Sequence, residues 1–194
     1  MEIRDRILAA AARVYQEVGF RGTTTRRVAI EAGVNEITLF RHFGSKSALL
    51  CEAIARAGGA MVTNTLPAEP GDDPAAEIVA WARAHMAELV RSRALLRTVM
   101  GEVQEHPEMV PPCGSPAALA AKSVAVYISR LQERGLARTD VDPVLAAAMI
   151  LGALFADAVG RDVMPDMFPN DPDTAAAEYA RLLIRAIGAE VPVA

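Results

Sequence analysis

The residues best suited to chemistry in this sequence are basic and hydroxyl side chains near the N-terminus. Among the first 50 residues, eight are Lys or Arg and five are acidic, which gives a net charge of +3. The other 144 residues carry a net charge of −7, so the chain as a whole has a formal charge of −4. This charge distribution predicts an N-terminal segment that binds an anionic partner and a larger remainder that does not.

Residues 24–43 have the layout of a helix-turn-helix. Thr24 is a suitable N-cap for a first helix, and Asn35 is a suitable N-cap for a second. Between the two helices, Gly33 permits a sharp turn because it has no Cβ to clash with the backbone. A second helix presented by such a short turn fits the major groove of DNA, with its N-terminal residues nearest the base edges.

The apolar residues of this second helix predict how it packs. Leu39 and Phe43 lie four residues apart and are expected to face inward, with Phe40 beside them, so Phe40 and Phe43 are both predicted to be core residues. Glu36 has two interpretations: its carboxylate could accept a hydrogen bond from cytosine N4, or it could simply favour the start of the helix.

Two helix starts in this segment are suited to binding phosphate, because their backbone N–H groups are free. Thr25 adds a hydroxyl at the first start. Ser45 can cap the second, where Lys46 opposes the helix dipole and therefore suggests an external anion. His42, at the end of the preceding helix, could donate to another phosphate.

These motifs resemble the N-terminal domain of the TetR family of transcriptional regulators. The resemblance extends over about 45 residues, and beyond Val62 it is only architectural. The residues that carry it are Ile7–Ala11, Gly22-Thr23-Thr24-Thr25, Val28-Ala29, Gly33-Val34, Thr38–Phe43, Ser45-Lys46 and Leu49-Leu50. It implies an all-α homodimer with a DNA-binding head and a ligand-binding body, and a cytoplasmic regulator, most simply a repressor, that binds an inverted-repeat operator and is released by a small apolar effector.

The resemblance also assigns roles to individual residues. Thr25, His42 and Lys46 correspond to phosphate contacts. Phe40 stands at another phosphate-contacting position, where the family usually has tyrosine, and it lacks the hydroxyl. The positions expected near the bases are Arg26, Asn35, Glu36, Ile37 and Arg41.

The remainder of the chain is predicted to be helical. Alanine, the strongest helix former, accounts for 38 of the 194 residues. Apolar spacing and the Asp-Pro and Ser-Pro helix starts predict nine helices, at residues 2–19, 24–32, 35–43, 45–62, 73–91, 93–106, 116–135, 143–163 and 172–188. We therefore expect a DNA-binding domain at residues 1–46 and a ligand-binding and dimerisation domain at residues 47–194.

The last two predicted helices are expected to form the dimer interface, as the resemblance implies. The helix at 143–163 is rich in small residues that permit close helix crossing, and it adds apolar area. The predicted interface residues are Leu145, Met149, Gly152, Ala153, Ala156, Tyr179, Leu183 and Ile187.

A ligand pocket is predicted between the helices at 73–91, 93–106, 116–135 and 143–163. Its expected lining is mostly apolar with a few polar groups, as is usual for small-molecule sites. The predicted residues are Trp81, His85, Met86, Met100, Tyr127 and Phe155. Each of them could equally be an ordinary core residue.

The sequence contains no Ser/His/Asp set, metal-binding pattern or nucleotide loop, so we expect neither an enzyme nor a bound cofactor. Cys51 and Cys113 form no metal or redox motif, which favours a reducing cytoplasm. The longest uncharged run, 143–156, is shorter than the ~20 residues of a membrane span. Two alternatives remain open: a helical small-molecule carrier, and a structural DNA-binding protein that needs no ligand.

Overall fold

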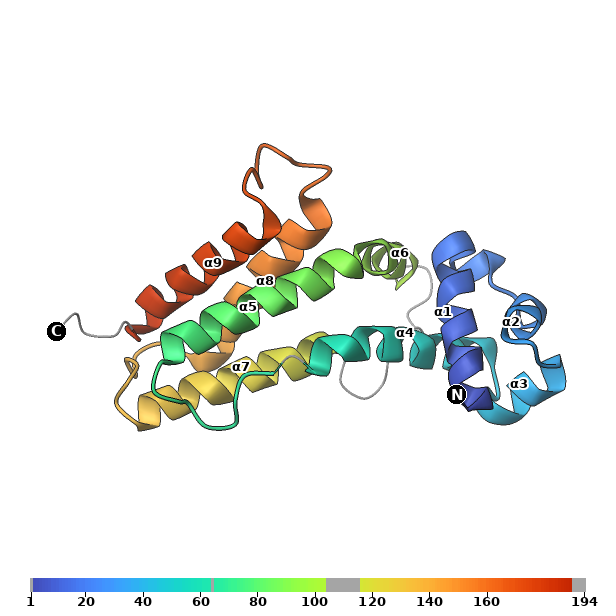
Figure 1. Cartoon of the computed structure of the whole chain (residues 1–194), viewed down its shortest axis with the longest axis horizontal. Coiled ribbons are helices and arrows are strands. Elements are labelled where there is room, and N and C mark those ends of the chain that lie inside the picture. Colours follow the sequence, from blue (N-terminus) through green and yellow to red (C-terminus); the bar gives the residue numbers. More distant parts are fainter. Residues whose placement is uncertain (1, 64, 104–115, 190–194) are drawn as a thin grey trace. The chain divides into compact units, whose positions relative to one another are not determined.

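The structure is a computed structural model that describes residues 2–63, 65–103 and 116–189. Every regular element in these ranges is an α-helix, which confirms the all-α class. The helices are α1 (Ile3–Gly22), α2 (Thr25–Ala32), α3 (Glu36–Phe43), α4 (Lys46–Thr63), α5 (Pro74–Arg91), α6 (Arg93–Val103), α7 (Pro116–Glu133), α8 (Pro143–Gly160) and α9 (Pro172–Ile187). Figure 1 shows their order along the chain.

The predicted helices are all present, with small differences at their ends. The first extends to Gly22 rather than residue 19, but Gly19 has non-helical angles (φ 66°, ψ −172°), so the chain kinks at the predicted break. The predicted end of the sixth helix, residues 104–106, lies outside the described residues, as does Cys113.

Aspartate-proline pairs start three of the helices. In each case a backbone N–H of the first turn donates to the aspartate side chain. The shortest of these contacts is 2.9 Å for Asp73, 2.7 Å for Asp142 and 3.1 Å for Asp171. In each case proline follows at the first helical position, where its missing N–H costs no hydrogen bond. These starts were predicted from sequence because every interaction involved is local.

The chain divides into two compact units. The head unit comprises Met1–Ala60 with Ala94–Ser115, and the body unit comprises Met61–Arg93 with Pro116–Ala194. This division differs from the predicted boundary at residue 46. The physical reason is that Leu49, Leu50 and Ala53 of α4 and Leu95 of α6 are buried in the core of the head unit.

Within the head unit, α1 packs on α2, and α2 packs on α3 (Figure 1). Within the body unit, α5 contacts α8 and α9, α7 contacts α8, and α8 contacts α9. The body unit is therefore a helical bundle in which α8 touches each of the other three helices.

Helix α8 is predominantly apolar. Its mean hydropathy of 1.9 over 18 residues would by length and composition suit a membrane span, although core helices of soluble proteins pass the same test. One face, which includes Ala147, Ile150 and Leu154, is buried in the bundle. The opposite face exposes Leu145 and Met149. An apolar helix that lies in a bundle and still exposes such a face needs an explanation for that second face.

Candidate nucleic-acid interface

The turn between α2 and α3 has the local geometry that the sequence predicts. Thr24 caps α2 by accepting the backbone N–H of Arg27 at 3.1 Å. Gly33 adopts the left-handed conformation (φ 64°, ψ 40°) that ends α2. Asn35 caps α3, because its Oδ1 accepts both the backbone N–H and the hydroxyl of Thr38, at 2.7 and 2.8 Å.

Arg6 of α1 holds this turn in place, a role that the sequence interpretation missed. Its Nη2 donates to the carbonyl oxygens of Ala32 and Gly33 at 2.6 and 3.1 Å. The guanidinium therefore satisfies carbonyls that the end of α2 leaves without helical partners. Because the contact spans more than 25 residues, nothing in the local sequence could have indicated it.

Helix α3 has an inward face and an outward face. Leu39 is fully buried and Phe43 is 8% exposed, as predicted, whereas Ile37 is 70% exposed. Phe40 is 45% exposed, so its assignment to the core is wrong. The reason is angular: successive residues of a helix are about 100° apart, so Phe40 cannot share the inward face of both Leu39 and Phe43.

Four acidic residues of the head unit are paired with arginines. The ion pairs join Arg4 to Glu52, Arg13 to Glu31, Arg27 to Glu17 and Arg56 to Asp5. The hydrogen bond from Arg56 holds the pKa of the Asp5 carboxyl below its usual value. Individually such exposed pairs add little stability. Together they confine the excess positive charge to other residues.

Arg26 and Arg41 carry part of that excess. Both side chains are exposed, and neither forms an ion pair within the part of the chain that the structure describes. His42 is also exposed, and its ring lies beside that of Phe43 with centroids 6.1 Å apart. These three predicted DNA contacts are therefore accessible to a partner.

Thr25 and Glu36, by contrast, contact each other. The Thr25 hydroxyl donates to Oε1 of Glu36, which links the start of α2 to the start of α3. Both residues are half-buried. The structure thus adds a third interpretation to the two that the sequence offers for Glu36: its carboxylate joins the two helices of the motif.

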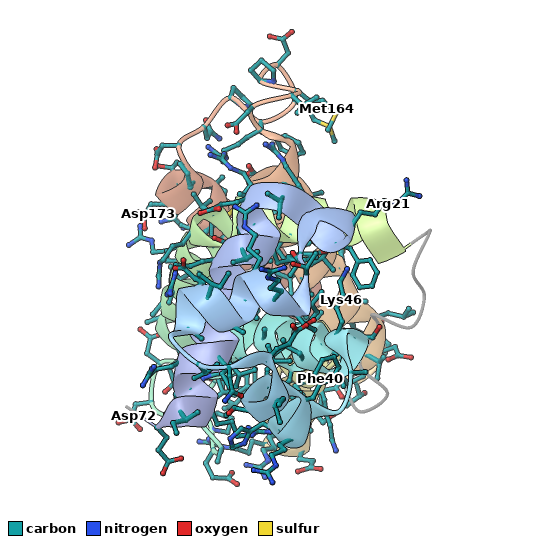
Figure 2. The ribbon with its side chains drawn as sticks, turned by 90° about the vertical axis from the view of Figure 1, so that its right-hand side faces the viewer. Arg21, Phe40, Lys46, Asp72, Met164 and Asp173 are labelled. Carbon is teal, nitrogen blue, oxygen red and sulfur yellow. The ribbon has the colours of Figure 1, made fainter. Side chains whose placement is uncertain are left out.

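Lys46 also has a contact within the chain. Its ammonium group donates to the carbonyl oxygen of Phe20 and lies 4.0 Å from the centroid of the Phe20 ring. Figure 2 labels Lys46 and Phe40 on the head unit, with Arg21 extending from the end of α1. An external phosphate at Lys46 would therefore share the ammonium group with the end of α1.

The predicted pocket residues fall into two groups. Trp81, His85, Met86 and Tyr127 are at least 96% buried in the body unit, and Phe155 is half-buried there. Met100 is 57% exposed and belongs to the head unit. Two grooves described in the body unit, of about 420 and 530 Å³, are lined by other residues.

The buried pocket residues include polar groups with distinct environments. The rings of Trp81 and His85 are stacked, with centroids 5.2 Å apart. His85 Nδ1 has no hydrogen-bond partner among the described residues, and burial lowers the pKa of His85 to about 4. The Tyr127 hydroxyl donates to Glu77 at 2.5 Å, and burial together with this bond raises the pKa of Tyr127.

The residues predicted to form the dimer interface also fall into an exposed group and a buried group. On α8, Leu145 and Met149 are 69% and 54% exposed, Gly152 and Ala156 are exposed, and Ala153 is half-buried. On α9, Leu183 and Ile187 are 1% and 0% exposed. The prediction that these two contact a partner is wrong, because they already pack inside their own bundle. Leu182, which is 58% exposed, is the apolar side chain that faces outward.

Tyr179, the remaining predicted interface residue, takes part in a buried polar network. Its hydroxyl donates to Asp157 at 2.9 Å, and burial and this bond raise its pKa to about 12. Asp157 is fully buried and also accepts from Arg161 at 2.5 Å. The network joins the end of α8 to α9.

A helix-turn-helix whose second helix has an exposed outward face is typical of DNA-binding transcriptional regulators. The comparisons with known proteins agree. Residues 7–53 match the model of the bacterial regulatory proteins of the tetR family. No curated protein matches the sequence at a significant level.

Solved structures resemble nearly the whole chain. Salmonella enterica GusR is 22% identical with a TM-score of 0.76, and the match covers 96% of this chain and 95% of GusR. SmeT, the repressor of the Stenotrophomonas maltophilia multidrug efflux pump SmeDEF, is 22% identical with a TM-score of 0.74, covering 98% and 94% of the two chains. A SmeT–triclosan complex is 21% identical with a TM-score of 0.72, covering 99% and 96%. The chain thus shares the fold of these solved structures.

Proposed function

We propose that this protein is a cytoplasmic transcriptional repressor that binds an inverted-repeat operator as a homodimer and is released by a small apolar effector. The observation that carries the proposal is the outward face of α3, where Ile37 is 70% exposed and the Arg41 side chain is available to DNA. The turn that presents this face is fixed by Gly33 and by the two hydrogen bonds from Arg6. A rigid reading helix is what major-groove recognition requires.

The exposed face of α8 supports a homodimer. Leu145, Met149, Gly152 and Ala156 recur at helical spacing and leave an apolar stripe in contact with solvent. A two-fold axis through such a stripe buries it against its own copy. The same symmetry allows two heads to read the two halves of an inverted repeat.

The body unit is the proposed site of effector binding. Trp81 and His85 supply an aromatic surface and a buried nitrogen, and Met86 and Tyr127 lie on the same bundle. SmeT, which shares the fold, has been solved with triclosan, a small molecule. An effector that bound the body unit would weaken operator binding by a coupling free energy of about 1–3 kcal/mol.

Selection of bound DNA from a random pool tests the proposal. We expect an enriched inverted repeat whose half-sites are about 34–36 Å apart, or a multiple of that distance. The logarithm of the affinity should fall linearly with the logarithm of the salt concentration. The slope should be about −0.9 for each phosphate neutralised.

Two arginine variants sharpen this test. R41A should weaken operator binding, because its side chain is exposed on α3. R13A removes another exposed arginine of the head unit, one that is ion-paired to Glu31, and this variant should bind as the wild type does. A pool without any enriched sequence would favour the small-molecule carrier. If a sequence were enriched but no ligand of the body unit changed its binding, the structural DNA-binding protein would be favoured.

A further inference from the structure

The residues predicted to lie near the bases differ in how much of each side chain is already engaged. Asn35 uses its Oδ1 to cap α3, with contacts of 2.7 and 2.8 Å to Thr38. Glu36 accepts the hydroxyl proton of Thr25. Ile37 has no polar atom in its side chain and is 70% exposed. In the first turn of α3, Ile37 is therefore an exposed apolar side chain with no polar contact to the protein.

The geometry of α3 directs Ile37 away from the protein. With about 100° per residue, Ile37 and Arg41 lie on one side of the helix axis, and Leu39 and Phe43 lie on the opposite side. Leu39 and Phe43 are anchored in the core, at 0% and 8% exposure. Their burial fixes the rotation of α3, so Ile37 and Arg41 together form its outward face.

An exposed isoleucine in this place has few suitable partners on DNA. Base edges in the major groove present hydrogen-bond donors and acceptors, and the apolar group among them is the C5-methyl of thymine. Phosphates are charged and offer an isoleucine no comparable contact. An apolar contact to this methyl is one of the standard ways in which side chains distinguish thymine from other bases.

We propose that Ile37 reads the C5-methyl group of a thymine in each half-site of the operator. This inference rests on the proposed function, because it names the feature of the DNA that the α3 face recognises. It defines the operators as sequences with a thymine opposite the first turn of α3 in both half-sites.

The test uses the full-length protein and the duplex enriched from the random pool. Each thymine of a half-site is replaced in turn by deoxyuridine, which lacks only the C5-methyl group, and the dissociation constant is measured. For the wild type, we expect one position at which the replacement weakens binding about fourfold, the effect of one buried methyl-sized group. Replacement in both half-sites should weaken binding about fifteenfold.

The variant I37A should bind thymine and uracil duplexes equally at that position. Ile30 provides a matched control, because it is 73% exposed on α2, outside the reading helix. I30A should retain the wild-type preference for thymine. Since both side chains are exposed, neither variant should alter the helical content measured by circular dichroism.

Three results would overturn the inference. A wild type that binds thymine and uracil duplexes alike at every position contradicts it, and so does I37A that keeps the preference for thymine. Loss of the preference in I30A as well would mean that the effect does not belong to Ile37. In all three cases the enriched operator would still support the proposed function. If no DNA sequence were enriched, the proposed function itself would fail, and the inference with it.

Discussion

His85 is a histidine whose environment favours the neutral imidazole. It is 2% exposed, its ring is stacked on Trp81, and its Nδ1 has no hydrogen-bond partner among the described residues. Burial penalises the charged form, which lowers the pKa from 6.5 to about 4. The unfolded chain therefore binds a proton between these two pH values that the folded chain does not bind.

This difference predicts how stability depends on pH. As the pH falls from 6.5 to 4, protonation of His85 stabilises only the unfolded chain, so the free energy of unfolding decreases. The expected slope is at most about 1.4 kcal/mol per pH unit. Urea unfolding of the wild type and of H85Q at several pH values in this window should show a smaller decrease for H85Q.

His42 provides the control for this measurement. Its ring is exposed in the folded chain, so H42Q controls for the replacement of a histidine by glutamine where no buried ring is removed. If H85Q and the wild type lost stability in parallel, the decrease would come from other groups, and the neutral state assigned to His85 would be contradicted.

At the scale of the element, the turn between α2 and α3 depends on a backbone conformation and on a distant side chain. Gly33 has φ +64°, and a Cβ built there would lie 3.1 Å from Nη2 of Arg6. The left-handed conformation ends α2, and Arg6 then binds the carbonyls that this end exposes. Position 33 is therefore constrained both by its own backbone and by α1.

The variant G33A should destabilise the protein by about 1–2 kcal/mol, the cost of a left-handed conformation for an L-residue. A lower melting temperature, by about 2–4 °C for each kcal/mol, is the measurable result. The matched control is G101A in α6, where a Cβ would meet nothing within 4 Å. Because alanine favours helix, G101A should leave stability unchanged or raise it by up to about 1 kcal/mol. Equal melting temperatures for G33A and the wild type would refute this account of the turn.

At the scale of the whole molecule, the proposed homodimer depends on the exposed face of α8. Leu145 and Met149 are more than half exposed, and with Val144, which is 66% exposed, they add apolar surface at the start of the helix. Leu182 on α9 adds to the exposed apolar surface of the bundle. Burying this surface between two copies gains free energy in proportion to the apolar area removed from water.

We therefore expect the wild type to sediment as a dimer at micromolar concentration and the variant L145E to sediment as a monomer. A carboxylate in the buried interface loses its hydration without gaining a partner. L119E, on α7, changes a leucine that is 47% exposed and lies outside the stripe, and it should remain dimeric. A monomeric wild type, or a dimeric L145E, would contradict the proposed interface.

The helices and the helix-turn-helix could be predicted because their signals are local. The interactions of the Asp-Pro helix starts and of the caps Thr24 and Asn35 reach only three or four residues along the chain. The same is true of a glycine that must adopt a positive φ, and of the motif that resembles the TetR family. These features are properties of the chain itself, whatever packs against it.

The division of the chain and the use of each apolar face required the tertiary structure. Sequence spacing shows that α9 has apolar residues, but only the packed bundle shows that Leu183 and Ile187 point inward and Leu182 points outward. The same holds for Arg6, whose role is defined by carbonyls more than 25 residues away. Burial is decided by which distant elements come together, whereas caps and turns are decided by neighbours in the chain.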